Sequence, residues 1–149
     1  MLENYDTNHK LDGTSSKETR QKVLEFIHAS EATIMLHCLA ILYLRASAPA
    51  ATSPPSSSTI DQMACALATN VRRDLDWLES ELGKNGGEYL AGEFSAADTM
   101  MIFGILFIFK RDLTCGKELS EWENLNKWVE RCTSRESWKK AVEKTGFVL

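Results

Sequence analysis

The chain has 149 residues and a mass of 16.7 kDa, which suits one domain because domains most often contain about 100–150 residues. Hydrophobic residues make up 44% and charged residues 26% of the chain, a balance that excludes disordered and collagen-like structure. The formal net charge is −4, and no cluster of Lys and Arg occurs. We therefore expect neither nucleic acid nor a membrane as a partner.

Four cysteines are present, and none has the spacing of zinc ligands. We expect Cys38, Cys65, Cys115 and Cys132 to be buried free thiols in a reducing compartment, which predicts a cytoplasmic protein. The N-terminal residues show no basic segment followed by an apolar core, so they do not resemble a signal peptide.

Long stretches without Gly or Pro, and without period-two alternation, predict an all-α fold: a bundle of about five helices around a central apolar helix. Residues 1–14 are polar and are expected to be a linker, and residues 15–149 the helical domain. The S-x-x-E spacing that begins at Ser15 predicts a capping box and a helix over about 16–46. Its apolar residues, 32–44, would span only about 20 Å, which is short of a membrane core of ~30 Å.

All three prolines fall within residues 46–59, which are predicted to form a loop. The next helix is expected to end at Asn85-Gly86-Gly87. Arg72 and Arg73 could hold an anionic partner, but with Asp74 and Asp76 beside them they are expected to form a solvated face. Apolar residues three or four apart predict one core face for this helix: Ile60, Ala64, Leu67, Val71, Leu75, Leu78 and Leu82.

Residues 100–109 are uncharged and almost wholly apolar, which predicts a central helix buried on all sides. Ser95 and Asp98 precede it with the spacing of a capping box, in which Asp98 would accept the backbone N–H of Ser95. Two further helices are predicted by apolar stripes, with Trp122 and Trp128 packed in the core rather than stacked on a ligand: Trp122, Leu125, Trp128, Val129 and Cys132, then Trp138, Ala141 and Val142.

This layout resembles the C-terminal domain of cytosolic glutathione S-transferases. Residues 93–98 (EFSAAD) look like that family's capping box and hydrophobic staple, with Thr99 as the staple partner. Residues 124–135 look like its C-terminal tail pattern, residues 26–31 (FIHASE) are similar to fungal members, and residues 2–6 (LENYD) look like the end of its thioredoxin-like domain. The tail usually continues with Pro, where this chain has Glu136.

The resemblance implies that a thioredoxin-like domain is missing from this chain. In the family, that domain holds glutathione, the co-substrate, and activates its thiol. We therefore expect that the isolated chain binds no cofactor and does not conjugate glutathione, and that it contains no catalytic residue.

Four residues on the first helix are candidates for substrate binding. His28, Glu31, Met35 and Leu39 follow one another at steps of three and four, which places them on one helical face. In the resembling family, the corresponding helix faces the thioredoxin-like domain across the active-site cleft, which implies a wall of the acceptor-substrate pocket. Packing against another domain or a second subunit would explain the same face. No metal is expected, because these residues and His37 lack metal-ligand spacing.

Two functions are open from the sequence. The first is the C-terminal domain of a glutathione S-transferase, which supplies the acceptor pocket and dimer surface for detoxification of small hydrophobic electrophiles. Its partners would be a second copy of the chain or a thioredoxin-like domain. The second is a non-catalytic protein-interaction module, similar to the helical domains of elongation-factor and synthetase assemblies.

Overall fold

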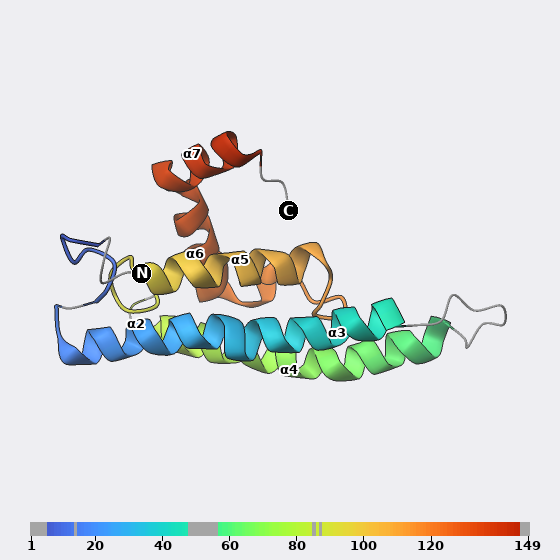
Figure 1. The fold of residues 1–149 in the computed structure, drawn as a ribbon. Coiled ribbons are helices and arrows are strands. Elements are labelled where there is room, and N and C mark those ends of the chain that lie inside the picture. Colours follow the sequence, from blue (N-terminus) through green and yellow to red (C-terminus); the bar gives the residue numbers. More distant parts are fainter. Residues whose placement is uncertain (1–5, 14, 48–56, 85, 87, 147–149) are drawn as a thin grey trace.

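The structure is a computed structural model that describes residues 6–13, 15–47, 57–84, 86 and 88–146. Within these residues it contains helices and turns, with one isolated β-bridge, which confirms the predicted all-α bundle (Figure 1). The elements in chain order are α2 (Lys17–Ala29), the π-helix η1 (Ser30–Met35), α3 (Leu36–Ser47), α4 (Ser57–Lys84), α5 (Ala96–Lys110), the 3₁₀ turn η2 (Leu119–Glu121), α6 (Glu123–Ser134) and α7 (Glu136–Thr145).

The predicted loop over residues 46–59 and the predicted helix end at residues 85–87 lie largely outside the described residues. The prolines of the predicted loop all lie in residues 48–56, which are not described. Asn85 and Gly87 are likewise outside, and α4 has its last helical residue at Lys84, where the prediction placed the end of this helix. Residues 1–5, which carry most of the resemblance to a preceding domain, are also not described.

The first predicted helix is one continuous run made of α2, η1 and α3, close to the predicted residues 16–46. Its cap is one residue later than predicted. Ser16 has an extended backbone, with φ −150°, and its Oγ accepts the Thr19 N–H at 3.0 Å. The capping box predicted to begin at Ser15 is therefore wrong by one residue, since the N-cap position requires this extended conformation.

The π-helix η1 changes the register of this run. Ser30, its first residue, is buried, and its hydroxyl donates to the Ile27 carbonyl at 2.7 Å. A π turn holds more residues than an α turn, so the side chains after it rotate to a new face. The buried residues accordingly recur every four positions across η1, at Phe26, Ser30, Ile34 and Cys38, with steps of three to Val23 before it and to Ile41 after it.

By length and hydropathy, the whole run from α2 to α3 would be able to cross a membrane. The short length of residues 32–44 therefore does not by itself exclude a span. In the structure, the run packs along α4 and α5, and one of its faces contributes to the main hydrophobic core.

Helix α4 shows the predicted amphipathic pattern. Its central stripe is buried against α3 and α6, and only Ile60 and Leu67 of the predicted residues are half-buried rather than buried. The far end of α4 also caps α6. Glu79 accepts the backbone N–H groups of Asn124 and Leu125 at 3.0 and 2.9 Å, at a helix start where no local side chain serves as a cap.

The solvated face predicted on α4 is wrong in part. Arg73 and Asp76 are exposed, as predicted. Asp74, however, is only 8% exposed, and the half-buried Arg72 donates to the Thr114 carbonyl at 2.8 Å. The reason is that α3 and the loop after α5 pack against this side of α4, so two charged side chains in the middle of the helix meet protein groups instead of water.

Helix α5 is the central helix, but it is not buried on all sides as predicted. Five of its apolar residues and its first turn are buried. Met100 and Phe103, in contrast, are 41% and 42% exposed. The helix packs against α2, η1 and α6, and among the described residues no element covers the face that carries these two side chains.

The C-terminal helices follow the two predicted stripes. All five residues of the first stripe are buried, including Trp122 and Trp128, which confirms their place in the core. Helix α7 contacts α6 and stands away from the other helices (Figure 1). In α7, Trp138 and Val142 are half-buried, whereas Ala141 is exposed.

The expectation of four buried free thiols is wrong for two of them. Cys65 of α4 and Cys115 of the loop after α5 form a disulfide with a Cα–Cα distance of 5.3 Å, within the usual range for such bonds. The fold brings together residues that are 50 positions apart, which spacing alone does not reveal. Cys38 and Cys132 are buried free thiols as predicted, and burial raises the pKa of each to about 12.

Candidate functional site

A cleft of about 480 Å³ opens between the α2–η1 run and α4. Of the four residues predicted for substrate binding, His28 lines this cleft, whereas Glu31, Met35 and Leu39 are not among its lining residues. Glu31 is exposed, and Met35 and Leu39 are half-buried. The π turn explains the separation, because its longer turn places Ala32 and Thr33, rather than Glu31 and Met35, beside His28. The cleft is lined by Glu25, His28, Ala29, Ala32, Thr33, Asp74 and Trp77.

His28 is the one lining residue that the sequence indicated, and Asp74 and Trp77 are the two that come from α4 rather than from the first helical run. The Trp77 ring packs against Phe26 with 5.3 Å between ring centroids, so the indole is half in the core and half in the cleft. Asp74 and Trp77 are three positions apart on α4, a spacing that places them on the same side of the helix, but neither belongs to the predicted apolar stripe. Only the packing of α2 against α4 shows that they share a cleft with His28.

Asp74, in the wall of the cleft, pairs with the half-buried imidazole of His37. His37 Nδ1 lies 2.6 Å from Asp74 Oδ2. Burial raises the pKa of Asp74 above its ordinary value, and the hydrogen bond and charge of His37 lower it by less. With Glu25 on the opposite wall, the cleft carries carboxylates around a floor of alanines and an indole. Such a lining disfavours anions and accommodates an uncharged, partly apolar molecule.

We expect Asp74 to titrate above the ordinary value of 3.8, and Asp6, which accepts two backbone N–H bonds, to titrate below it. Because the folded pKa of Asp74 is raised, its contribution to stability is present below pH 3.8 and is lost as the pH rises through the folded value. Carboxyl ¹³C NMR titration measures both residues. His37→Ala should raise the pKa of Asp74 further. An Asp74 pKa at or below that of Asp6 would contradict this account.

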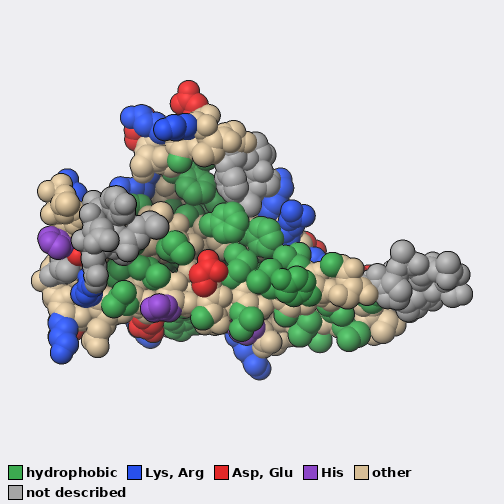
Figure 2. Space-filling view, in the orientation of Figure 1, with side chains coloured by type: hydrophobic (Ala, Val, Ile, Leu, Met, Phe, Trp, Pro, Cys, Tyr) green, Lys and Arg blue, Asp and Glu red, His purple; other side chains and the backbone are tan. Residues whose placement is uncertain are grey.

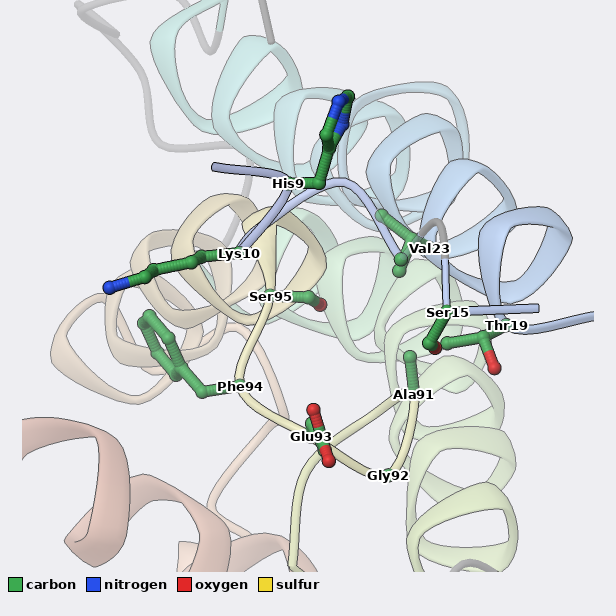
Figure 3. Close-up of a pocket in the computed structure, with 11 residues that line it drawn as sticks. His9, Lys10, Ser15, Thr19, Val23, Ala91, Gly92, Glu93, Phe94 and Ser95 are labelled. Carbon is green, nitrogen blue, oxygen red and sulfur yellow. The ribbon is translucent and has the colours of Figure 1, made fainter. Parts of the chain in front are cut away.

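A second hollow, of about 210 Å³, lies where the N-terminal segment, residues 6–13, docks onto the bundle (Figure 3). The Leu11 carbonyl accepts the Ala96 N–H at 3.0 Å, which ties this segment to the start of α5. Gly13 is required here, because it has φ +72° and a Cβ would lie 2.7 Å from the Val23 side chain. Figure 3 shows Ser95 and Glu93 facing this hollow from the opposite loop.

A short ion pair stiffens the same segment. His9 Nδ1 lies 2.7 Å from Asp12 Oδ2, and this hydrogen bond raises the pKa of His9. Asp12 is buried and also lies 3.8 Å from an Arg20 guanidinium nitrogen of α2. These contacts hold the segment in place, and they assign no chemistry to the hollow.

The predicted capping box at Ser95 and Asp98 is present. Asp98 accepts the Ser95 N–H at 2.9 Å, as predicted. It also accepts the Ser95 hydroxyl at 3.1 Å, the Leu90 N–H at 3.1 Å and Trp128 Nε1 at 2.8 Å. The side chain of Asp98 therefore fixes the start of α5, the preceding loop and α6 together, and its role is structural.

The loop before α5 is held by aromatic contacts as well. Phe94, the predicted staple residue, meets the Tyr89 ring edge-on at 5.5 Å between centroids. The Arg135 guanidinium lies 3.6 Å from the centroid of the Phe94 ring. Thr99 donates its hydroxyl to the Ser95 carbonyl at 3.3 Å.

A capped apolar core helix within a bundle of five helical runs defines the class of fold, and comparison with known proteins identifies the family. Residues 28–136 match the family described as the glutathione S-transferase C-terminal domain. The chain therefore belongs to the glutathione S-transferase family, and its fold is the all-helical C-terminal domain of that family.

Two similar proteins carry the same family name. Glutathione S-transferase 1 of Saccharomyces cerevisiae is 31% identical over 74 residues, which cover 50% of this chain and 30% of the yeast protein. The crystal structure of a glutathione S-transferase from Actinobacillus pleuropneumoniae superimposes with a TM-score of 0.70 and 14% identity, and the match covers 97% of this chain and 59% of that one. This second likeness supports the fold alone. Each match spans only part of the other protein.

Proposed function

We propose that this chain acts as the C-terminal domain of a glutathione-conjugating enzyme and supplies the apolar wall of the acceptor pocket together with a dimer surface. The observation that carries the proposal is the exposed apolar face of α5. Met100 and Phe103 are two-fifths exposed, and the Phe103 ring stacks on Phe107 with 5.9 Å between centroids. An apolar face of this kind at the centre of a domain marks an interface or a binding site.

Further apolar side chains are exposed on the first helical run. Leu36 is 59% and Tyr43 is 65% exposed. Figure 2 shows hydrophobic side chains gathered over α5 and the neighbouring α3. The two expected partners would cover these two apolar faces, the one on α5 and the one on the first helical run. A thioredoxin-like domain would cover one face, and a second copy of the chain in a homodimer would cover the other.

The cleft at His28 supports a role in binding the electrophile rather than glutathione. Glutathione is an anion, and Glu25 and Asp74 would repel it at this site. A small hydrophobic electrophile carries no such charge and would contact the alanines and Trp77. Glu31, Met35 and Leu39 lie outside this cleft, and for these three the proposal is contact with the thioredoxin-like domain or the second subunit.

Activation of the glutathione thiol would come from the thioredoxin-like domain, which would lower the thiol pKa by hydrogen-bonding the anion. A cytoplasmic role in detoxification belongs to the same proposal. The similar proteins are named glutathione S-transferases, and this does not favour the alternative of a non-catalytic interaction module.

Conjugation assays with the purified chain test the proposal. With glutathione and a general electrophile, the chain alone should show no turnover above the uncatalysed rate. Addition of a separate thioredoxin-like domain from a glutathione S-transferase should produce a complex and restore conjugation. Phe103→Lys should weaken complex formation and lower the restored conjugation rate, because it places a charge on the apolar face of α5.

Met63→Lys is the matched control, since Met63 is an exposed apolar residue of α4, and this variant should behave as the unaltered chain does. Turnover by the chain alone would overturn the proposed division of labour. Failure of the added domain to bind, or equal effects of the two lysine variants, would show that the α5 face does not serve this interface.

A further inference from the structure

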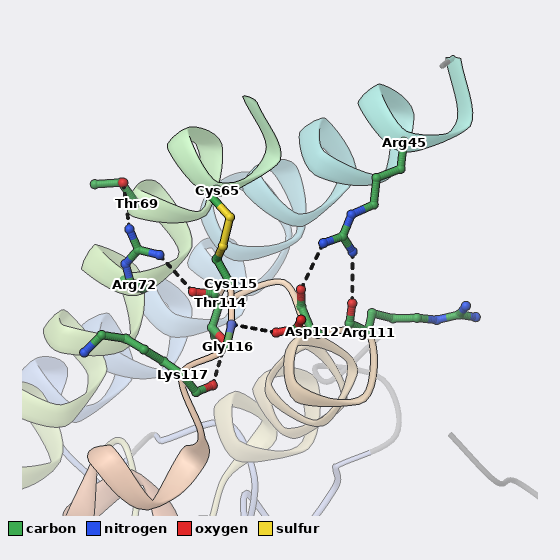
Figure 4. Close-up of a disulfide and its surroundings, with 10 residues drawn as sticks. All are labelled: Arg45, Cys65, Thr69, Arg72, Arg111, Asp112, Thr114, Cys115, Gly116 and Lys117. Carbon is green, nitrogen blue, oxygen red and sulfur yellow. Dashed lines mark hydrogen bonds between the residues drawn. A yellow bond between two sulfur atoms is a disulfide. The ribbon is translucent and has the colours of Figure 1, made fainter. Parts of the chain in front are cut away.

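The Cys65–Cys115 disulfide lies at an accessible edge of the bundle. Cys65 is half-buried on α4, and Cys115 is exposed in the loop after α5. Figure 4 shows the bond joining the α4 helix directly to this loop. A hollow of about 350 Å³ lies on the residues that follow Cys115, and its lining includes Asp112, Gly116, Lys117 and Glu118 but not Cys115 itself.

The loop that carries Cys115 is held by positively charged side chains (Figure 4). Arg72 of α4 donates to the Thr114 carbonyl at 2.8 Å, and Arg45 of α3 donates to the carbonyls of Arg111 and Asp112, each at 3.1 Å. These contacts hold the loop so that Cys115 lies opposite Cys65.

The two remaining cysteines contrast with this pair. Cys38 and Cys132 are buried, and burial raises the pKa of each thiol to about 12. Thiolates are the reactive form, so these two residues are inert at neutral pH. The chain therefore holds one disulfide-bonded pair with an exposed member, Cys115, and two buried thiols that serve as internal references.

We propose that Cys65 and Cys115 are a reversible redox modification site that is oxidised by low-molecular-weight disulfides. The thiolate of Cys115 attacks one sulfur of the small disulfide, which breaks its S–S bond, releases one small thiol and leaves a mixed disulfide on Cys115. The thiolate of Cys65 then attacks the sulfur of Cys115 and releases the second small thiol. Two protein thiols are oxidised, one small disulfide is reduced to two thiols, and the two protons pass to the released thiolates.

Oxidation links the loop after α5 covalently to α4, and reduction leaves it held by the hydrogen bonds of Arg45 and Arg72 and by the buried Leu113. In the cytoplasmic location proposed above, a disulfide with this accessibility would be of the transient, redox-sensing kind. The modification therefore reports on, and responds to, the ratio of small disulfide to thiol around the protein.

The test incubates the reduced chain with oxidised glutathione as the probe, followed by acid quenching, alkylation in denaturant and mass measurement of the intact protein. The unaltered chain should lose two of its four alkylatable thiols without retaining glutathione, and peptide mapping should find residues 65 and 115 joined. Cys65→Ser should trap one glutathionyl group on Cys115, because no second thiol resolves it. Cys115→Ser should react about tenfold more slowly.

Protection of Cys38 and Cys132 from alkylation until denaturant is added shows that each variant is folded. The mapping of the unaltered chain tests the proposal even where a variant does not fold. A stable glutathione adduct on the unaltered chain, a disulfide that involves Cys38 or Cys132, or an undiminished rate in Cys115→Ser would overturn the proposal.

Discussion

Replacement of Asp98 by Ala should lower the free energy of unfolding by about 2–5 kcal/mol, as measured by urea denaturation. Loss of a helix cap costs about 0.5–2 kcal/mol, and buried donors left without a partner add about 1–3 kcal/mol. Asp98 is 0% exposed and accepts hydrogen bonds from Leu90, Ser95 and Trp128. Water cannot replace these bonds at the centre of the core, so the upper part of the range is expected.

The matched control is Asp61→Ala. Asp61 is an exposed aspartate on α4, and its replacement should change stability by about 0.5 kcal/mol or less. Asp74 is unsuitable as the exposed control, because the structure buries it beside His37. Equal destabilisation by Asp98→Ala and Asp61→Ala would show that the network around Asp98 does not stabilise the fold. Trp128→Phe removes the indole N–H together with its hydrogen bond to Asp98. It should therefore lower the free energy of unfolding by less than Asp98→Ala does.

The local features of the fold could be predicted from the sequence because they depend on residues close together in the chain. The apolar stripes of α4 and α6 and the Ser95–Asp98 cap each need only a spacing of three or four residues. The bond from Trp128 to Asp98 joins residues 30 positions apart. No local pattern indicates such a bond, although it makes the cap a link between α5 and α6.

Features of the candidate site were harder to predict for two physical reasons. The π turn at η1 changes the number of residues per turn, so the face assigned to His28, Glu31, Met35 and Leu39 by an ideal α-helix does not hold past Ser30. The environment of charged residues depends on the elements that cover them. Asp74 and Asp76 differ by two positions, yet only Asp74 is buried against α3.

Reduction of the Cys65–Cys115 bond should lower the free energy of unfolding by about 4 kcal/mol. The bond closes a loop of 50 residues, and in the chain-entropy account a crosslink of this length restricts the unfolded chain by about that amount. Urea denaturation with and without a thiol reductant measures the difference. The free energy of unfolding of the oxidised chain should also fall less steeply with urea concentration, because the closed loop keeps the denatured chain more compact.

The control for this measurement is the double variant Cys65→Ala and Cys115→Ala, which cannot form the bond. Its stability should be close to that of the reduced chain and should not respond to reductant. Arg45 and Arg72 still hold the loop after α5 in that variant, so the native fold is retained and the loss arises from the unfolded chain. A reductant effect that persists in the double variant would place its origin outside this bond. Equal stability of the oxidised and reduced forms would mean that strain in the folded state offsets the entropic gain.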